Sequence, residues 1–142
     1  MEYLALLTFV LFAIPISIWD IKNLTIPDIL TALSAASLLA FRLIFTRNDI
    51  LLYLGAALAS FLLLLLVRLL TRKSLGLGDV KYGIPCGLYA GPVAAFAGFF
   101  LACVAAFLWT KMRRLPKDSP FPFAPFLALG TAVAGLTIQI LQ

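Results

Sequence analysis

The chain has 142 residues, of which 63% are hydrophobic and only 12% are charged, and its mean hydropathy is +1.10. Soluble domains carry about 25% charged residues, so this composition excludes a soluble globular protein. The net charge of +5 is not gathered into a basic patch interleaved with aromatic residues, which excludes nucleic acid as a partner. We therefore expect an integral membrane protein, surrounded by the lipid bilayer and folded as one domain over residues 1–142.

Apolar stretches follow one another along the whole chain, at about 3–19, 29–45, 50–70, 83–109 and 123–141. The fourth stretch is too long for one span, since its roughly 27 residues would reach about 40 Å as a helix. It contains Gly91 and Pro92, a turn signal in which the proline suits the first turn of a new helix. The sequence therefore predicts two helices there, at about 80–90 and 92–110, with one kinked helix as the alternative. The predicted fold is an all-α polytopic transmembrane bundle of about six helices.

Positive charges in the loops predict how this bundle is oriented. When the loops are taken alternately, one set holds nine positive charges: Lys22, Arg68, Arg72, Lys73, Lys81, Lys111, Arg113, Arg114 and Lys117. The other set holds two, Arg42 and Arg47. The positive-inside rule places the first set in the cytoplasm, so both termini are expected on the non-cytoplasmic side. With five spans instead of six this bias would disappear.

Histidine is absent and cysteine is scarce, which narrows the available chemistry. Without histidine, neither histidine-based catalysis nor a histidine-ligated metal is possible. Cys86 and Cys103 lie in apolar stretches without the spacing of a zinc site or a redox pair, so we expect small buried side chains. The sequence predicts no metal and no cofactor.

Six acidic residues remain, and three of them fall near helix ends on the predicted cytoplasmic side: Asp20, Asp28 and Asp79. The others, Glu2, Asp49 and Asp118, lie elsewhere and are interpreted as solvated loop or terminal residues. Asp20 ends the first apolar stretch, where the helix dipole disfavours a negative charge. The structural alternative is that Asp20 marks the membrane boundary together with Lys22.

Asp28 has a structural explanation. Thr25 and Asp28 have the spacing of a capping box, and Pro27 between them suits a first helical turn. An acid at that position also complements the helix dipole. We therefore expect Pro27 and Asp28 to be structural residues near the site.

Asp79 follows the glycine-rich segment "GLG" and precedes a helix, so a simple N-cap is the structural alternative. A cap does not require Gly76 and Gly78, however. Glycines permit positive φ and let another backbone approach closely. Such a loop is suited to holding an extended peptide substrate against it.

Two carboxylates at one membrane face indicate a particular chemistry. Carboxylates within about 3–5 Å cannot both ionise easily, so such a pair shares a proton. One can then activate water while the other donates to a peptide carbonyl, which is aspartic peptidase chemistry.

A proton-coupled transporter is the main alternative, but it should hold its acids near the bilayer midplane. A structural subunit of a membrane complex is the second alternative.

Three segments carry a resemblance to a known family. "GLGDVKYG" (76–83) resembles the GxGDxK signature of the prepilin peptidases, which are membrane aspartic peptidases. "WDIKNLTIPD" (19–28) and "FPFAPFLALG" (121–130) resemble that family's first and last motifs, in the same order. The resemblance implies that Asp20 and Asp79 are the catalytic pair, with Gly76, Gly78 and Lys81 completing the GxGDxK motif.

The resemblance also implies a substrate and a location. The family cleaves the basic leader of type IV pilin-like precursors at the cytoplasmic face of the inner membrane. Here Asp28 replaces the family's asparagine after Ile-Pro, and Ala124 replaces a glycine of the last motif. The paired CxxC motifs linked to N-methylation in larger members are absent from this sequence. We therefore expect a peptidase-only form without a separate methyltransferase or zinc-binding segment.

Overall fold

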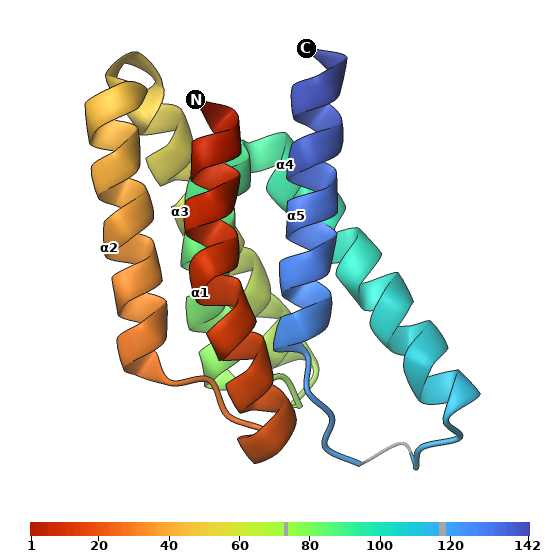
Figure 1. Ribbon diagram of the computed structural model, residues 1–142. Coiled ribbons are helices and arrows are strands. Elements are labelled where there is room, and N and C mark those ends of the chain that lie inside the picture. Colours follow the sequence, from red (N-terminus) through yellow and green to blue (C-terminus); the bar gives the residue numbers. More distant parts are fainter. Residues whose placement is uncertain (73, 117–118) are drawn as a thin grey trace.

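The computed structural model describes residues 1–72, 74–116 and 119–142, and it is built from helices (Figure 1). In chain order the elements are α1 (Glu2–Asn23), α2 (Asp28–Phe45), the short 3-10 helix η1 (Arg47–Asp49), α3 (Ile50–Leu70), α4 (Leu77–Met112) and α5 (Ala124–Leu141). This confirms the predicted all-α class. The predicted loop residues Lys73, Lys117 and Asp118 lie outside the described residues.

Among the residues that the structure describes, five helices are long and apolar enough to cross a membrane, so the chain is a multi-pass membrane protein. Large apolar side chains cover the outside of the bundle: Leu51, Ile29 and Phe100 are 80%, 75% and 70% exposed. In a bilayer these side chains face lipid, which is as apolar as they are. The inside is packed with smaller residues and a few aromatic rings.

Helix α4 is broken at Gly91, where φ is 75° and ψ is 177°. Glycine adopts this backbone conformation without the strain that a Cβ would cause, and Pro92 beyond it has no N–H for the preceding turn. The first arm (77–90) runs toward the end of the bundle that holds both termini, and the second arm (92–112) returns (Figure 1). The predicted division is therefore confirmed, and the described residues form six α-helical segments in addition to η1.

The two arms of α4 pack against different helices through small residues. A Cβ added at Gly87 would lie 2.6 Å from Ala57 Cα, so only glycine lets the first arm approach α3 this closely. A Cβ added at Gly98 would lie 2.6 Å from Thr131 Cα, so the second arm is equally close to α5. Such contacts hold helices together where the solvent is itself apolar.

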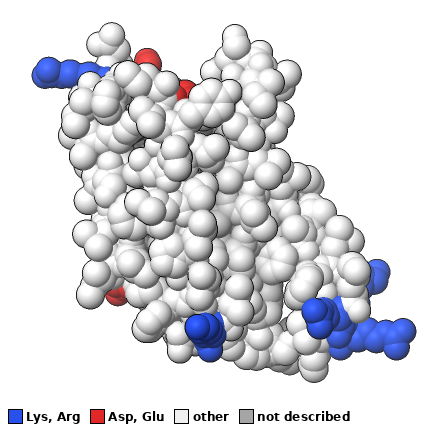
Figure 2. All heavy atoms as spheres, in the orientation of Figure 1, with Lys and Arg blue, Asp and Glu red and all other residues white. Residues whose placement is uncertain are grey.

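The bundle has two polar ends (Figure 1). At one end, which we call the site end, lie the described connecting residues 24–27, 71–72, 74–76, 113–116 and 119–123. At the other, the far end, lie both termini, η1 and the break at Gly91. On the face that Figure 2 shows, Lys and Arg side chains lie at the site end, and positive charge also projects from the far end.

The two cysteines differ from the prediction and from each other. Cys86 is buried on the first arm of α4, as expected, but Cys103 is exposed. The expectation that both are buried was wrong because Cys103 lies on the outward face of the second arm. An apolar stretch of sequence does not distinguish a lipid-facing position from an internal one.

Candidate active site

Asp20 lies in the last turn of α1 and is only 5% exposed. The helix ends at Asn23, and the next residue, Leu24, has a left-handed backbone and donates its N–H to the Asp20 carbonyl oxygen at 2.8 Å. The Asp20 carboxylate accepts a hydrogen bond at Oδ2 from the N–H of Ala124, at 3.0 Å. Ala124 is the first residue of α5. Asp20 therefore joins the end of α1 to the start of α5.

This contact changes the electrostatic interpretation of Asp20. The sequence places it at the C-terminus of its own helix, where a negative charge is opposed by the dipole. The start of α5 supplies the opposite end of a second dipole, with an N–H that has no partner inside that helix. A carboxylate is a good acceptor for such an N–H, so Asp20 is bound within the fold and is not a simple boundary marker.

Asp79 lies in the first turn of α4, three residues after Gly76, the residue that precedes the helix. The N-cap interpretation of Asp79 is therefore wrong, because the capping position belongs to Gly76. Oδ1 of Asp79 is buried and has no hydrogen-bond partner among the residues that the structure describes. A buried carboxylate oxygen without a partner is costly, and a catalytic role is one of the reasons for which native proteins retain such a group.

Asp20 and Asp79 line one pocket at the site end, with a volume of ≈ 360 Å³. The pocket is bounded by the end of α1, the α1–α2 connection and the start of α4. Its lining residues are Asp20, Leu24, Thr25, Ile26, Asp28, Gly76, Leu77, Gly78, Asp79 and Lys81. All the predicted site residues except Pro27 line this pocket.

The two glycines of the GxGD segment are explained by close approach. A Cβ at Gly78 would lie 2.8 Å from the Cβ of Ile26, so Gly78 lets the α1–α2 connection sit directly on the start of α4. A Cβ at Gly76 would lie 3.1 Å from Oδ2 of Asp79. Neither glycine uses a positive φ. The backbone that approaches Gly78 is thus the protein's own, and binding of a peptide to this loop stays a prediction.

The predicted capping box at Thr25 was wrong. Pro27 is the residue that precedes α2, with an extended backbone (φ −69°, ψ 125°) and no side-chain cap, and the helix begins at Asp28. The residue before a proline is pushed away from helical geometry, so Ile26 cannot start a helix. Asp28 instead pairs with Lys81, whose Nζ lies 3.0 Å from both carboxylate oxygens. Both side chains are exposed, at 69% and 46%.

The sequence did not predict the roles of two residues at this site. Ala124 was noted only as a departure from the family motif, yet its N–H binds the Asp20 carboxylate. Arg68 was counted as a loop charge, but it lies in α3 and donates to the carbonyl of Leu75, just before the GxGD segment. The last motif, which ends in α5, was a usable signal for the contact between Ala124 and Asp20. No local pattern in the sequence indicates the contact between Arg68 and Leu75.

Comparisons with known proteins place the chain in one family. The model of the type IV leader peptidase family matches residues 7–111, a range that includes Asp20 and Asp79. The chain belongs to this family. It is 29% identical over 140 residues to a prepilin leader peptidase/N-methyltransferase of Bacillus subtilis, with 96% of this chain and 56% of the relative covered. It is 30% identical over 146 residues to a protein of the same name from Dickeya chrysanthemi, with 96% and 51% covered.

The chain thus spans about half the length of these relatives. No solved structure was found to match it. The family match supports neither the transporter nor the structural-subunit alternative.

Proposed function

We propose that this protein is an aspartic endopeptidase that removes the basic leader of type IV pilin-like precursors, with Asp20 and Asp79 as the catalytic pair. The observation that carries the proposal is the pocket lined by both carboxylates, in a chain of the type IV leader peptidase family. Gly76, Gly78 and Lys81 then complete the motif around Asp79. Pro27 and Asp28 support the neighbouring wall of the pocket.

In the proposed reaction the two carboxylates share one proton and act on water and on the scissile peptide. The ionised carboxylate takes a proton from water, whose oxygen attacks the peptide carbonyl carbon, while the protonated partner donates to the carbonyl oxygen. Collapse of the intermediate breaks the C–N bond, and the amine leaves with a proton from the pair. Oδ2 of Asp20 accepts the Ala124 N–H, so we expect the shared proton on another oxygen of the pair. The dyad titrates as a unit, and neither role is assigned to one aspartate.

The site end is proposed to face the cytoplasm. Seven described positive residues belong to the connections and helix ends there: Lys22, Arg68, Arg72, Lys81, Lys111, Arg113 and Arg114. At the far end Arg47 is exposed, whereas Arg42 is buried in an ion pair. The positive-inside rule then favours an inner-membrane protein with both termini outside and the pocket inside. A precursor held by its own membrane helix would present its leader to the pocket from that side.

The test is cleavage by the purified chain. The protein in detergent or liposomes is incubated with a panel of type IV pilin-like precursors, and the products are identified by mass. We expect the wild type to cut at least one precursor at a single peptide bond, and Asp79→Asn to leave it whole. Asp49→Asn is the matched control, since Asp49 is an exposed acid of the far end. Normal cleavage by folded Asp79→Asn would refute the proposal.

A further inference from the structure

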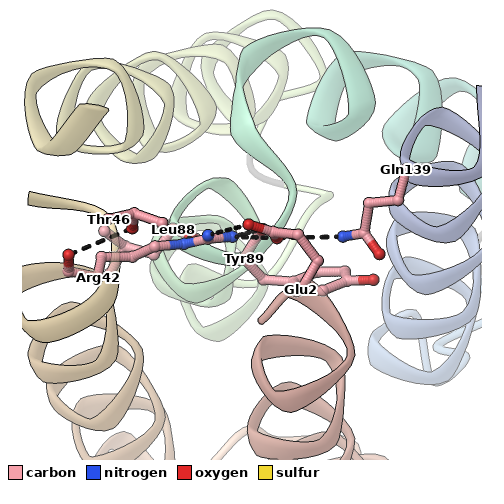
Figure 3. A network of polar contacts seen from close by, with 6 residues as sticks. All are labelled: Glu2, Arg42, Thr46, Leu88, Tyr89 and Gln139. Atoms are coloured by element: carbon pink, nitrogen blue, oxygen red, sulfur yellow. Dashed lines mark hydrogen bonds and ion pairs between the residues drawn. The ribbon is translucent and has the colours of Figure 1, made fainter. Parts of the chain in front are cut away.

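A second polar cluster lies at the far end, away from the pocket, and is centred on Arg42 (Figure 3). Arg42 is 0% exposed and belongs to the last turn of α2. Its guanidinium donates to both carboxylate oxygens of Glu2, at 2.8 and 3.1 Å, and lies 3.6 Å from the centre of the Tyr53 ring. Gln139 of α5 also donates to Glu2, at 3.3 Å. We call Glu2, Arg42, Tyr53 and Gln139 the Arg42 cluster. The prediction that Arg42 is a loop charge on the outer side was wrong.

The remaining donors of Arg42 are directed at the end of the first arm of α4. Its Nε donates to the Leu88 carbonyl at 3.0 Å, and its Nη2 donates to the Tyr89 carbonyl at 2.6 Å (Figure 3). In an unbroken helix the Leu88 carbonyl would accept from residue 92, but that residue is a proline without an N–H. The residue that would serve Tyr89 lies beyond the break at Gly91. Arg42 therefore replaces the missing donors.

The Arg42 cluster joins the two helices that carry the aspartates. Glu2 is the first residue of α1, and Asp20 lies in the last turn of the same helix. Leu88 and Tyr89 end the first arm of α4, and Asp79 lies in its first turn. One guanidinium thus binds α1 and the first arm of α4 at the ends opposite to Asp20 and Asp79. A helix does not compress along its axis. Fixing its end at the Arg42 cluster therefore also fixes the position of its aspartate along the helix axis.

We propose that Arg42 is a positioning residue that sets the axial register of α1 against the first arm of α4, and thereby brings Asp20 and Asp79 to the same level. The inference rests on the proposed function for its effect on cleavage, but not for its geometry. A guanidinium is suited to this role because its planar fork binds a carboxylate and carbonyls in fixed directions. A lysine would keep the charge and lose that geometry.

The inference is tested by cross-linking, which needs no activity. Asp20→Cys and Asp79→Cys are combined in a Cys86→Ala, Cys103→Ser background, and a short bis-maleimide reports how closely positions 20 and 79 approach. Trp109→Cys with Phe126→Cys is the control pair, because these rings lie 6.1 Å apart between the second arm of α4 and α5, away from the Arg42 cluster. Each pair is measured with Arg42 intact and with Arg42→Gln, Arg42→Lys and Glu2→Gln. Arg47→Gln, at an exposed arginine of the far end, is the control substitution.

We expect Arg42→Gln to remove most of the cross-link between positions 20 and 79 and to leave the control pair unchanged. Arg42→Lys and Glu2→Gln should give smaller losses, and Arg47→Gln none. Cleavage by Arg42→Gln should fall by about 100-fold in kcat, the cost of misplacing catalytic groups by about 1 Å, with KM little changed.

Two results would overturn the inference. One is an unchanged cross-link between positions 20 and 79 in Arg42→Gln. The other is that every variant of the cluster loses both the control cross-link and the cross-link between positions 20 and 79. That result would mean that Arg42 stabilises the whole fold. If the wild type cuts no precursor while the cross-links behave as expected, the proposed function fails and the positioning role of Arg42 stands.

Discussion

The two ends of this bundle differ in how fully their buried charged groups are hydrogen-bonded. At the far end, the Arg42 guanidinium is matched by a carboxylate, two backbone carbonyls and an aromatic ring. At the site end, Asp20 has one backbone donor and Asp79 has a buried oxygen with no partner among the described residues. Satisfied polar groups make a structure rigid, whereas unsatisfied ones remain available for chemistry. The far end is therefore suited to holding the helices in place while the site end keeps its carboxylates free.

The largest effect should come from moving a carboxylate within the pocket. Asp79→Glu adds one methylene to a side chain beside the buried Asp20, and a displacement of about 1 Å costs about 100-fold in rate. We therefore expect cleavage to fall by about that factor while the thermal unfolding temperature stays near that of the wild type. Asp49→Glu, at the exposed far end, is the matched control and should cut normally. An active Asp79→Glu variant would mean that the geometry of the pocket is not critical.

A smaller effect is expected where the walls of the pocket meet. In Gly78→Ala the new Cβ would lie 2.8 Å from Ile26 Cβ, closer than real Cβ contacts, so the α1–α2 connection must shift. We expect cleavage to fall by about tenfold, in keeping with a displacement smaller than 1 Å. Gly55→Ala is the control, because nothing lies within 4 Å of a Cβ there. Equal rates for the two alanine variants would contradict this account of the GxGD glycines.

Packing away from the site should affect stability before activity. In Gly87→Ala the added Cβ would lie 2.6 Å from both the Ala56 carbonyl oxygen and Ala57 Cα, and these are backbone atoms that cannot turn aside. Overpacking of this kind costs about 1–3 kcal/mol. Thermal unfolding in detergent should show a lower midpoint than for Gly55→Ala. The same midpoint for both variants would mean that α3 and α4 are less closely packed than described.

The smallest effect is expected at the exposed ion pair on the rim of the pocket. Asp28→Asn restores the family residue named above and removes the charge that faces Lys81. Exposed pairs contribute about 0–1 kcal/mol, so cleavage should change by less than about fivefold. A loss as large as that of Asp79→Glu would instead place Asp28 among the reacting groups.

Local signals in the sequence predicted much of this fold. The Gly91-Pro92 pair predicted the break in α4, because both residues act on their own backbone. Asp20 and Asp79 were predicted to share a membrane face because each ends or begins a helix, and the loops alternate between faces. The division into helices and the choice of site residues therefore needed no knowledge of packing.

Contacts between distant segments were not predictable in this way. The bond between Ala124 and Asp20 joins residues 104 positions apart, and the bonds of Arg42 span 40 to 47 positions. Nothing near Arg42 in the sequence indicates that it is buried, since it ends an apolar helix as a boundary charge would. The capping box failed for the opposite reason: Pro27 shifted the start of α2 beyond the predicted cap.

Asp20 and Asp79 are proposed to act together on one peptide bond. The most direct measurement is the single-turnover cleavage rate of a precursor that the wild type cuts, for the wild type, Asp20→Asn, Asp79→Asn and the double variant. Residues that act as a unit are strongly non-additive. We predict that each single substitution removes nearly all of the rate and that the double variant is no slower than either. Losses that multiply in the double variant, or a single variant that cuts at the wild-type rate, would contradict the dyad.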